Sequence, residues 1–288
     1  MLTRRAPAKI NLALEVLAKR RDGFHEIRSV IQAINLCDSF SFQSGDNIEF
    51  KCDLPDWIAE ESLASRAATL LQEATGCAEG ATIEVSKRIP LLSGLGGDSS
   101  DAAAVLRGLN ELWGLGLSPE ELLKMAWKLG SDVAFFLYGG TALLEGRGEI
   151  VIPLPPLPRR WVVLAMPSVP RRPGKTKQLY DSLKANHYTD GQITRRLVEE
   201  LKAGREFRPS LLFNTFENVA FTRFSELGVS RSHLVKMGAR DVHLAGSGPA
   251  LFTMVENKAQ AEGLYSLLQK ERLEPYLAET LDALDQTG

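Results

Sequence analysis

Residues 90–104 read Pro90-Leu91-Leu92-Ser93-Gly94-Leu95-Gly96-Gly97-Asp98-Ser99-Ser100-Asp101-Ala102-Ala103-Ala104. The alternating apolar residues of 81–85 predict a strand before this stretch, and helical spacing over 105–113 predicts a helix after it. Glycine lets the backbone take positive φ and approach a ligand, and the N–H groups of such a turn and of a helix N-terminus attract an anion. An ordinary tight turn capped by Ser or Asp is the simpler alternative. Three glycines within four residues, followed by two serines and a helix start, favour a phosphate-binding loop.

Two common phosphate loops do not fit this stretch. The dinucleotide-binding pattern G-x-G-x-x-G fails because Ser99 stands where its last glycine belongs, and no Lys-Ser/Thr pair follows the glycines as in a Walker loop. In order and spacing the stretch resembles the phosphate motif of the GHMP small-molecule kinases. It departs from that motif at Asp98, where a third glycine is usual. We expect Asp98 to point to solvent; capping of the following helix or contact with a metal ion are the alternatives.

Composition indicates an ordinary globular protein. The chain has 288 residues, 44% hydrophobic and 24% charged, and its net charge of −2 gives no field that would attract nucleic acid or a membrane surface. The three cysteines are dispersed without a C-x-x-C pair, as in a reduced compartment, and the four histidines lack metal-ligand spacing. No apolar run resembles a signal peptide or reaches the length of a bilayer span. We therefore expect a cytoplasmic protein, a monomer or weak homodimer, with no nucleic-acid or membrane partner.

Two charged residues outside the loop stand out. Alternation over 9–16 predicts a half-buried strand that places Lys9 and Asn11 on one face, where the simpler interpretation is a solvated face. Asp132 follows the end of a helix that begins at Ser118-Pro119 and ends at Gly130, and the residues alone indicate a helix cap as readily as a catalytic group. Elsewhere, spacing predicts strands over 27–36, 39–42, 48–52, 141–144, 149–154 and 161–166, helices over 63–73, 193–202 and 258–272, and a last strand near Tyr276.

Further motifs resemble the same family in the same order: 6–12, 20–25, 129–136, 145–149 and 246–252. The segment Asp22-Gly23-Phe24-His25 is similar to that of the GHMP branch whose substrate carries a cytidine diphosphate group, with Phe24 in place of Tyr. The resemblance implies an α+β, two-domain GHMP kinase fold with a deep cleft between the domains. Prolines at 153, 155, 156 and 158 predict the boundary, giving a nucleotide-binding and catalytic domain over 1–154 and a GHMP C-terminal domain over 155–288.

The resemblance also implies a reaction: transfer of the γ-phosphate of ATP to the 2-hydroxyl of 4-diphosphocytidyl-2-C-methyl-D-erythritol, in non-mevalonate isoprenoid synthesis. Asp132 would be the general base and Lys9 its partner, and ATP would bind at 90–100 with Mg²⁺, for which Ser99 or Ser100 is a ligand candidate. The candidate substrate-binding residues are Asn11, Phe24, His25, Arg147 and Thr176, and those of a closing loop are Gly246, Ser247 and Gly248. Another GHMP kinase, acting on mevalonate-pathway compounds or a sugar, and a non-catalytic nucleotide-binding relative are the alternatives.

Overall fold

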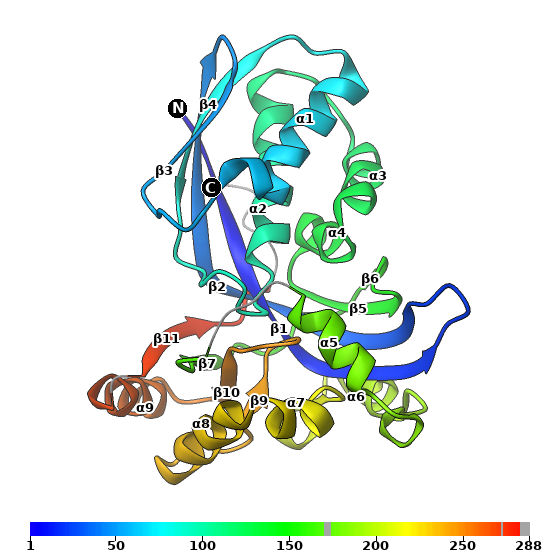
Figure 1. Cartoon of the computed structure of the whole chain (residues 1–288), viewed down its shortest axis with the longest axis vertical. Coiled ribbons are helices and arrows are strands. Elements are labelled where there is room, and N and C mark those ends of the chain that lie inside the picture. The colour runs from blue at the N-terminus through cyan, green and yellow to red at the C-terminus, as the bar shows by residue number, and fades with distance from the viewer. Residues whose placement is uncertain (170–173, 272, 283–288) are drawn as a thin grey trace.

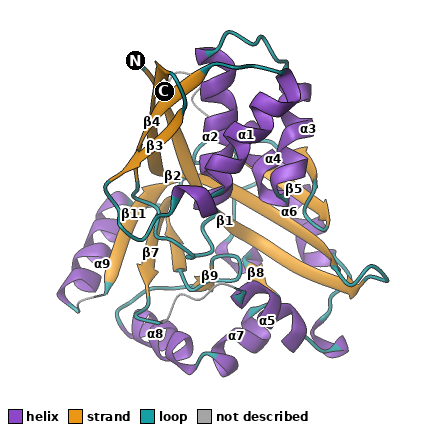
Figure 2. Cartoon of the chain, turned by 45° about the horizontal axis from the view of Figure 1, so that its top comes forward, coloured by secondary structure: helices purple, strands orange, loops and turns teal. Residues whose placement is uncertain are grey.

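A computed structural model describes residues 1–169, 174–271 and 273–282. It contains two sheets (Figures 1 and 2): a seven-stranded sheet in which β3, β4, β2, β1 and β8 are neighbours and β5 and β6 extend from β2, and a four-stranded sheet of order β11-β7-β10-β9. Helices α1–α4 lie on one side of β1–β4, and α7–α9 lie beside the smaller sheet. The expected α+β class is confirmed.

In the N-terminal half, helices begin and end at residues that are typical helix caps. Ser118 forms a capping box with Glu121 at the start of α3, and Gly76, in the left-handed region at φ 68°, ends α1. The elements are β1 Leu2–Lys19, β2 His25–Gly45, β3 Ile48–Cys52, η1 Ala59–Glu61, α1 Leu63–Thr75, β4 Gly80–Ser86, α2 Gly97–Leu112, α3 Pro119–Leu129, α4 Ser131–Tyr138, β5 Thr141–Gly146 and β6 Ile150–Pro153.

The long hairpin of β1 and β2 differs from the prediction in two ways. The expected strands 27–36 and 39–42 are one strand, β2, because it stays paired with β1 through a register shift between Pro7 and Ala8. The strand expected to be half-buried is buried on both faces over 6–16. Helix α2 packs against β1. Helix α6, which belongs to the C-terminal half, packs against both strands of the hairpin.

Helix α2 packs tightly on the sheet because its contact face is made of small residues. Ala102, Ala103 and Ala104 are fully buried. At Gly108 a Cβ would lie 2.3 Å from the ring of Phe42 on β2, so only glycine allows this approach. The phosphate loop, which precedes α2, is thereby held at one end of the sheet.

The C-terminal half adds the smaller sheet and its helices. Its elements are β7 Trp161–Met166, α5 Lys175–Ser182, η2 Ala185–His187, α6 Gln192–Lys202, η3 Pro209–Leu211, β8 Phe213–Asn214, α7 Glu217–Arg223, α8 Ser225–Lys236, β9 His243–Leu244, β10 Leu251–Val255, α9 Lys258–Lys270 and β11 Glu274–Glu279. Helix α9 ends two residues before the predicted end at 272, a residue outside the described ranges. The predicted strand near Tyr276 is β11.

The two halves meet closely. β8 pairs in parallel with β1, so the C-terminal half supplies an edge strand to the larger sheet. One hydrophobic cluster contains residues of both halves, among them Ile10 and Leu12 of β1 and Phe252 of β10. Pro153 ends β6, and Pro155, Pro156 and Pro158 lie in the loop between β6 and β7; the boundary at 154/155 stays a prediction.

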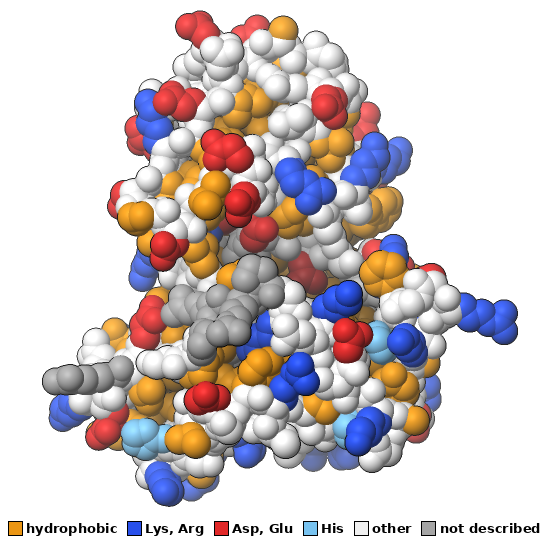
Figure 3. All heavy atoms as spheres, in the orientation of Figure 1, with side chains coloured by type: hydrophobic (Ala, Val, Ile, Leu, Met, Phe, Trp, Pro, Cys, Tyr) orange, Lys and Arg blue, Asp and Glu red, His pale blue; other side chains and the backbone are white. Residues whose placement is uncertain are grey.

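The surface agrees with the small net charge. On the face in Figure 3 acidic and basic side chains are interspersed, and the surface narrows between the upper and lower parts of the molecule. Among the described residues, we find no helix long and apolar enough to cross a membrane.

Candidate active site

The glycine-rich loop joins β4 to α2 in the conformation expected for an anion site. Gly94 and Gly96 have φ values of 85° and 78°, and α2 begins at Gly97, so N–H groups of the loop and of the first helical turn lie together. The loop is tied to two other segments: Lys9 N donates to Leu95 O at 2.9 Å, and Ala250 N donates to Ser93 O at 3.0 Å.

A buried ion cluster fixes the chain where it enters the loop. Lys87 pairs with both Asp38 and Asp101, all three side chains being almost fully buried, and Asp38 Oδ1 accepts from Ile89 N at 2.8 Å. Burial, and then the nearby charge of Asp38, raise the pKa of Asp101 well above its usual range, against the attraction of Lys87. The cluster ties β2, the end of β4 and α2 together beneath the loop.

The predicted closing loop lies directly against the phosphate loop. A Cβ on Gly94 would lie 2.3 Å from Ala245 O, and one on Gly246 would lie 3.1 Å from Lys9 Nζ. Ser247 Oγ and Thr176 Oγ1 share a hydrogen bond of 2.7 Å. Glycines at these positions let two backbones and a lysine meet at one point.

Lys9 and Asp132, distant in sequence, come together beside both loops. Lys9 Nζ lies 3.7 Å from Asp132 Oδ2. The Lys9 side chain is 7% exposed and the Asp132 side chain 36%, so the carboxylate is the member of the pair open to a substrate. Asp132 lies in the first turn of α4, where Gly130 is the N-cap and no side chain makes the capping bond. The alternative of a helix cap is therefore wrong for Asp132.

A buried hydrogen-bond chain positions Lys9. Its Nζ donates to Asn11 Oδ1 at 2.9 Å, Asn11 Nδ2 donates to Ser29 Oγ at 2.9 Å, and Ser29 Oγ donates to Ala13 O at 2.8 Å. Lys9 and Asn11 share a face as predicted, and that face points into the site rather than to solvent. Such a connected network restricts the lysine to one rotamer.

A pocket of about 350 Å³ runs along the phosphate loop. Of the residues 90–100 that the motif predicts to bind ATP, all except Leu95 and Ser100 line this pocket. The other side is formed by Asp56, Trp57, Ile58 and Glu61, which sequence reasoning missed. The available signal was an aromatic residue in a loop, Pro55-Asp56-Trp57, which offers a face for a nucleotide base.

Asp98 faces solvent, as expected, and also makes a contact that the sequence did not predict. Its Oδ1 accepts a 2.9 Å hydrogen bond from Leu63 N, the first residue of α1. The expectation that Asp98 faces solvent is confirmed, since the residue is exposed. Asp98 does not cap the following helix; its hydrogen bond supports α1, the helix that precedes it in the chain. Burial raises the pKa of this carboxyl, against the opposing effect of the Leu63 hydrogen bond.

Phe24 and His25 diverge at the start of β2. Phe24 is 55% exposed, with the Arg147 guanidinium 4.6 Å from its ring centre. His25 is buried and stacks on Tyr180 of α5, with ring centres 4.6 Å apart. Burial, followed by the charge of Lys19, lowers the pKa of His25, which favours a neutral imidazole with one donor and one acceptor nitrogen. Burial, and the charge of Asp132, raise the pKa of Tyr180 to about 12, so His25, Tyr180 and Asp132 belong to one region.

Two further supporting residues were not predicted. Asn214 is buried and donates to Leu244 O and Gly246 O, both at 2.8 Å, which holds the closing loop in place. Lys175 Nζ is buried near Gly248 without a hydrogen-bond partner among the described residues, and burial lowers its pKa to about 8. The sequence did not predict a role for either residue in the site, because each is brought there by contacts between segments far apart in the chain.

Comparison with known proteins agrees with this geometry. The family model for the GHMP kinase N-terminal domain matches residues 62–140. A 4-diphosphocytidyl-2-C-methyl-D-erythritol kinase from Dehalococcoides mccartyi (strain ATCC BAA-2266 / KCTC 15142 / 195) is 48% identical over 285 residues, covering 99% of this chain and 100% of that protein. The crystal structure of a 4-(cytidine 5'-diphospho)-2C-methyl-D-erythritol kinase superposes with a TM-score of 0.83 at 33% identity, covering 97% of this chain and 99% of that one. L. major mevalonate kinase, at 16% identity and a TM-score of 0.68 over 99% of this chain and 97% of that one, shares the fold.

The fold and the loop at the start of α2 thus define the class, the GHMP kinases. Within that class, the similarity to the two kinases named above extends over nearly the full length of the chain and decides the family. The chain belongs to the 4-diphosphocytidyl-2-C-methyl-D-erythritol kinase family.

Proposed function

We propose that this chain transfers the γ-phosphoryl group of ATP to the 2-hydroxyl of 4-diphosphocytidyl-2-C-methyl-D-erythritol, a step of non-mevalonate isoprenoid synthesis. Its curated relatives bear the name of this kinase. The observation that carries the proposal is the Lys9–Asp132 pair, 3.7 Å apart and adjacent to the phosphate loop.

The residues divide the reaction between them. Asp132 takes the proton of the substrate's 2-hydroxyl. The hydroxyl oxygen forms a bond to the γ-phosphorus while the bond between that phosphorus and the ADP oxygen breaks. Lys9, held by Asn11, offsets the negative charge that accumulates on the transferred group. The N–H groups of the 90–100 loop and the start of α2 hold the phosphates, and the loop 246–248 covers them.

Mg²⁺ would neutralise phosphate charge and align the leaving group. The described residues contain no cluster of three or more His, Cys, Asp or Glu side chains arranged for a metal. That fits an ion held mainly by phosphates, with few protein ligands. Of the two serines, Ser100 is the poorer ligand, because its Oγ is shielded from solvent. Ser99 is half-buried and lines the pocket, and we assign it the ligand role.

The cytosine would bind at the start of β2, beside Phe24 and His25. The exposed Phe24 ring offers a stacking face and the neutral His25 a hydrogen-bonding edge. Arg147, over Phe24, is placed near the diphosphate, and Thr176 contacts the substrate beside Ser247. We propose that domain 1–154 supplies the base and nucleotide loop, that domain 155–288 supplies the closing loop, and that the chain acts in the cytoplasm as a monomer or weak homodimer.

A coupled ADP-release assay tests the proposal. We expect turnover with the cytidine substrate and Mg²⁺, and none above background with mevalonate, with galactose or without an acceptor. Turnover of mevalonate or galactose in preference would identify another GHMP kinase. Nucleotide binding without phosphoryl transfer to any of these acceptors would identify a non-catalytic relative.

A further inference from the structure

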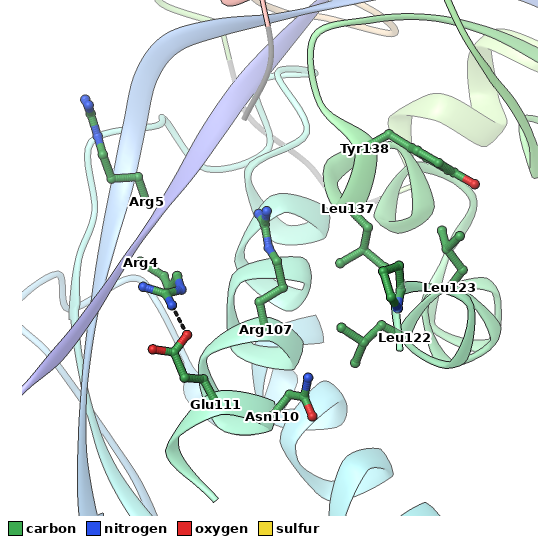
Figure 4. Close-up of a pocket in the computed structure, with 10 residues that line it drawn as sticks. Arg4, Arg5, Arg107, Asn110, Glu111, Leu122, Leu123, Leu137 and Tyr138 are labelled. Atoms are coloured by element: carbon green, nitrogen blue, oxygen red, sulfur yellow. Dashed lines mark hydrogen bonds and ion pairs between the residues drawn. The ribbon is translucent and has the colours of Figure 1, made fainter. Parts of the chain in front are cut away.

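A second pocket lies away from the phosphate loop, between the start of β1, the C-terminal part of α2, and helices α3 and α4 (Figure 4). Its volume is about 300 Å³, which suits a small ligand. The described residues that line it are all different from those lining the pocket along the phosphate loop. The proposed reaction assigns it no role.

The pocket contains a guanidinium group with unsatisfied donors. Arg107 donates to Phe136 O at 3.2 Å through Nη2, while its buried Nε has no partner among the described residues. The carboxylate of this pocket, Glu111, pairs with Arg4 instead (Figure 4). Burial, and then the charge of Arg4, lower the pKa of Arg107 to about 10, so the group remains charged at neutral pH, and no described residue forms an ion pair with it.

The charge and the apolar surface face one another. Arg4 and Arg107 lie on one side, whereas the Arg5 side chain points to the other side of β1, as alternation along a strand requires (Figure 4). The opposite wall is apolar and is formed by Leu122 and Leu123 of α3 and Leu137 of α4. One excess positive charge facing three leucines matches an anion that carries an apolar body.

We propose that this pocket binds a phosphate ester of a small apolar alcohol, with the phosphate between Arg4 and Arg107 and the apolar body against Leu122, Leu123 and Leu137. The phosphate would balance the excess positive charge of Arg4 and Arg107. The ligand would touch the C-terminal parts of α2 and α4, the two helices whose N-terminal turns hold the phosphate loop and Asp132.

Calorimetric titration with n-hexyl phosphate tests the site. The protein is first saturated with Mg²⁺ and a non-hydrolysable ATP analogue, so that the phosphate loop is occupied. We expect hexyl phosphate to bind roughly tenfold or more tightly than inorganic phosphate or 1-hexanol. Only the ester can contact both the arginines on one wall and the leucines on the other. Loss of hexyl phosphate binding on saturation with the analogue would place the probe in the phosphate loop and overturn the proposal.

Two variants locate the probe. Arg107→Gln keeps a donor for Phe136 O but removes the charge, and we expect binding to weaken roughly tenfold. Glu111→Gln removes the competing carboxylate from an exposed position, and we expect binding to tighten about three- to tenfold. The same change at Glu199 on α6 should leave binding unchanged. If Arg107→Gln fails to fold, Glu111→Gln decides alone; equal affinity of Glu111→Gln and wild type, or no binding by either, contradicts the proposal.

Discussion

Lys9 Nζ lies 2.9 Å from Asn11 Oδ1 and 3.7 Å from Asp132 Oδ2, and a Cβ on Gly246 would lie 3.1 Å from it. The lysine is buried among groups that fix its rotamer, while Asp132 is partly open. This asymmetry fits the two roles that we propose, Asp132 as the base that contacts the substrate and Lys9 as a positive charge held in one place.

Asp132→Asn keeps the shape and hydrogen bonding of the side chain but removes the base. We expect kcat to fall by roughly two orders of magnitude or more with ATP affinity nearly unchanged, measured by steady-state kinetics and nucleotide titration. Lys9→Met should reduce kcat in the same way. Asp53→Asn, the same change at an exposed carboxylate after β3, is the control. Near wild-type turnover of Asp132→Asn would remove Asp132 from the mechanism.

His25→Ala should raise the KM for the cytidine substrate and leave the KM for ATP unchanged. Loss of one hydrogen bond with a neutral partner costs about 1 kcal/mol, and more if a buried polar edge of the base is left unpaired. Steady-state kinetics with each substrate varied in turn measures both constants. A change confined to the ATP constant would show that the cytosine site has been placed in the wrong part of the molecule.

Asp98 caps α1 through a hydrogen bond from Leu63 N. Replacement by Gly should lower the free energy of unfolding by about 1 kcal/mol, because the N–H at the start of α1 loses its acceptor, and the Mg²⁺ dependence of turnover should not change. Asp98→Asn keeps an acceptor oxygen and should retain most of the stability. Urea unfolding compares the three proteins; a raised Mg²⁺ requirement in Asp98→Gly at unchanged stability would instead indicate a metal ligand.

At the scale of elements, the closing loop depends on a strand from elsewhere in the chain. β8 pairs with β1 and places Asn214 so that both its donors reach carbonyls of the loop. The loop therefore inherits its position from the larger sheet, although its own strands, β9 and β10, belong to the smaller one.

Asn214→Ala would leave two buried carbonyls without partners. We expect a loss of about 2–4 kcal/mol in the free energy of unfolding and a higher KM for ATP, because the loop that covers the phosphates is no longer held. Asn218→Ala is the matched control, since Asn218 donates one bond, to Thr215 O at 3.1 Å, away from the loop. Equal effects of the two substitutions on the KM for ATP would show that Asn214 does not position the loop.

At the scale of the whole molecule, His25 joins the two halves. It lies on β2 and stacks on Tyr180 of α5. Because its pKa is lowered in the folded chain, the unfolded chain binds a proton more readily as the pH falls below the ordinary histidine range. Stability is then fully present above that range and declines as the pH falls toward the lower, folded-state pKa.

His25→Phe keeps an aromatic ring against Tyr180 but cannot titrate. Between about pH 8 and about pH 5, we expect the wild type to lose more unfolding free energy than this variant does. Chemical denaturation at each pH measures the difference, and His233→Gln on α8, an exposed histidine, is the control. The same pH dependence in wild type and His25→Phe would contradict a role for His25 in the acid response.

The sequence predicted the strand, the glycine loop and the capped helix α3. It also indicated Lys9 and Asp132, the residues we propose as catalytic, through the family motifs. Turns, caps and periodic burial depend on residues a few positions apart, so a linear pattern records them. The match of motifs in order along the chain was enough to indicate the family.

Only the tertiary structure decided which distant segments meet. It placed Asp98 against α1, Asn214 against the closing loop and Trp57 beside the pocket along the phosphate loop, and it buried both faces of β1 over residues 6–16. Each of these depends on a contact between residues far apart in sequence, made because α2 packs on β1 and β8 joins its edge. Local propensity carries no record of such contacts, since the same residues in another packing would face water.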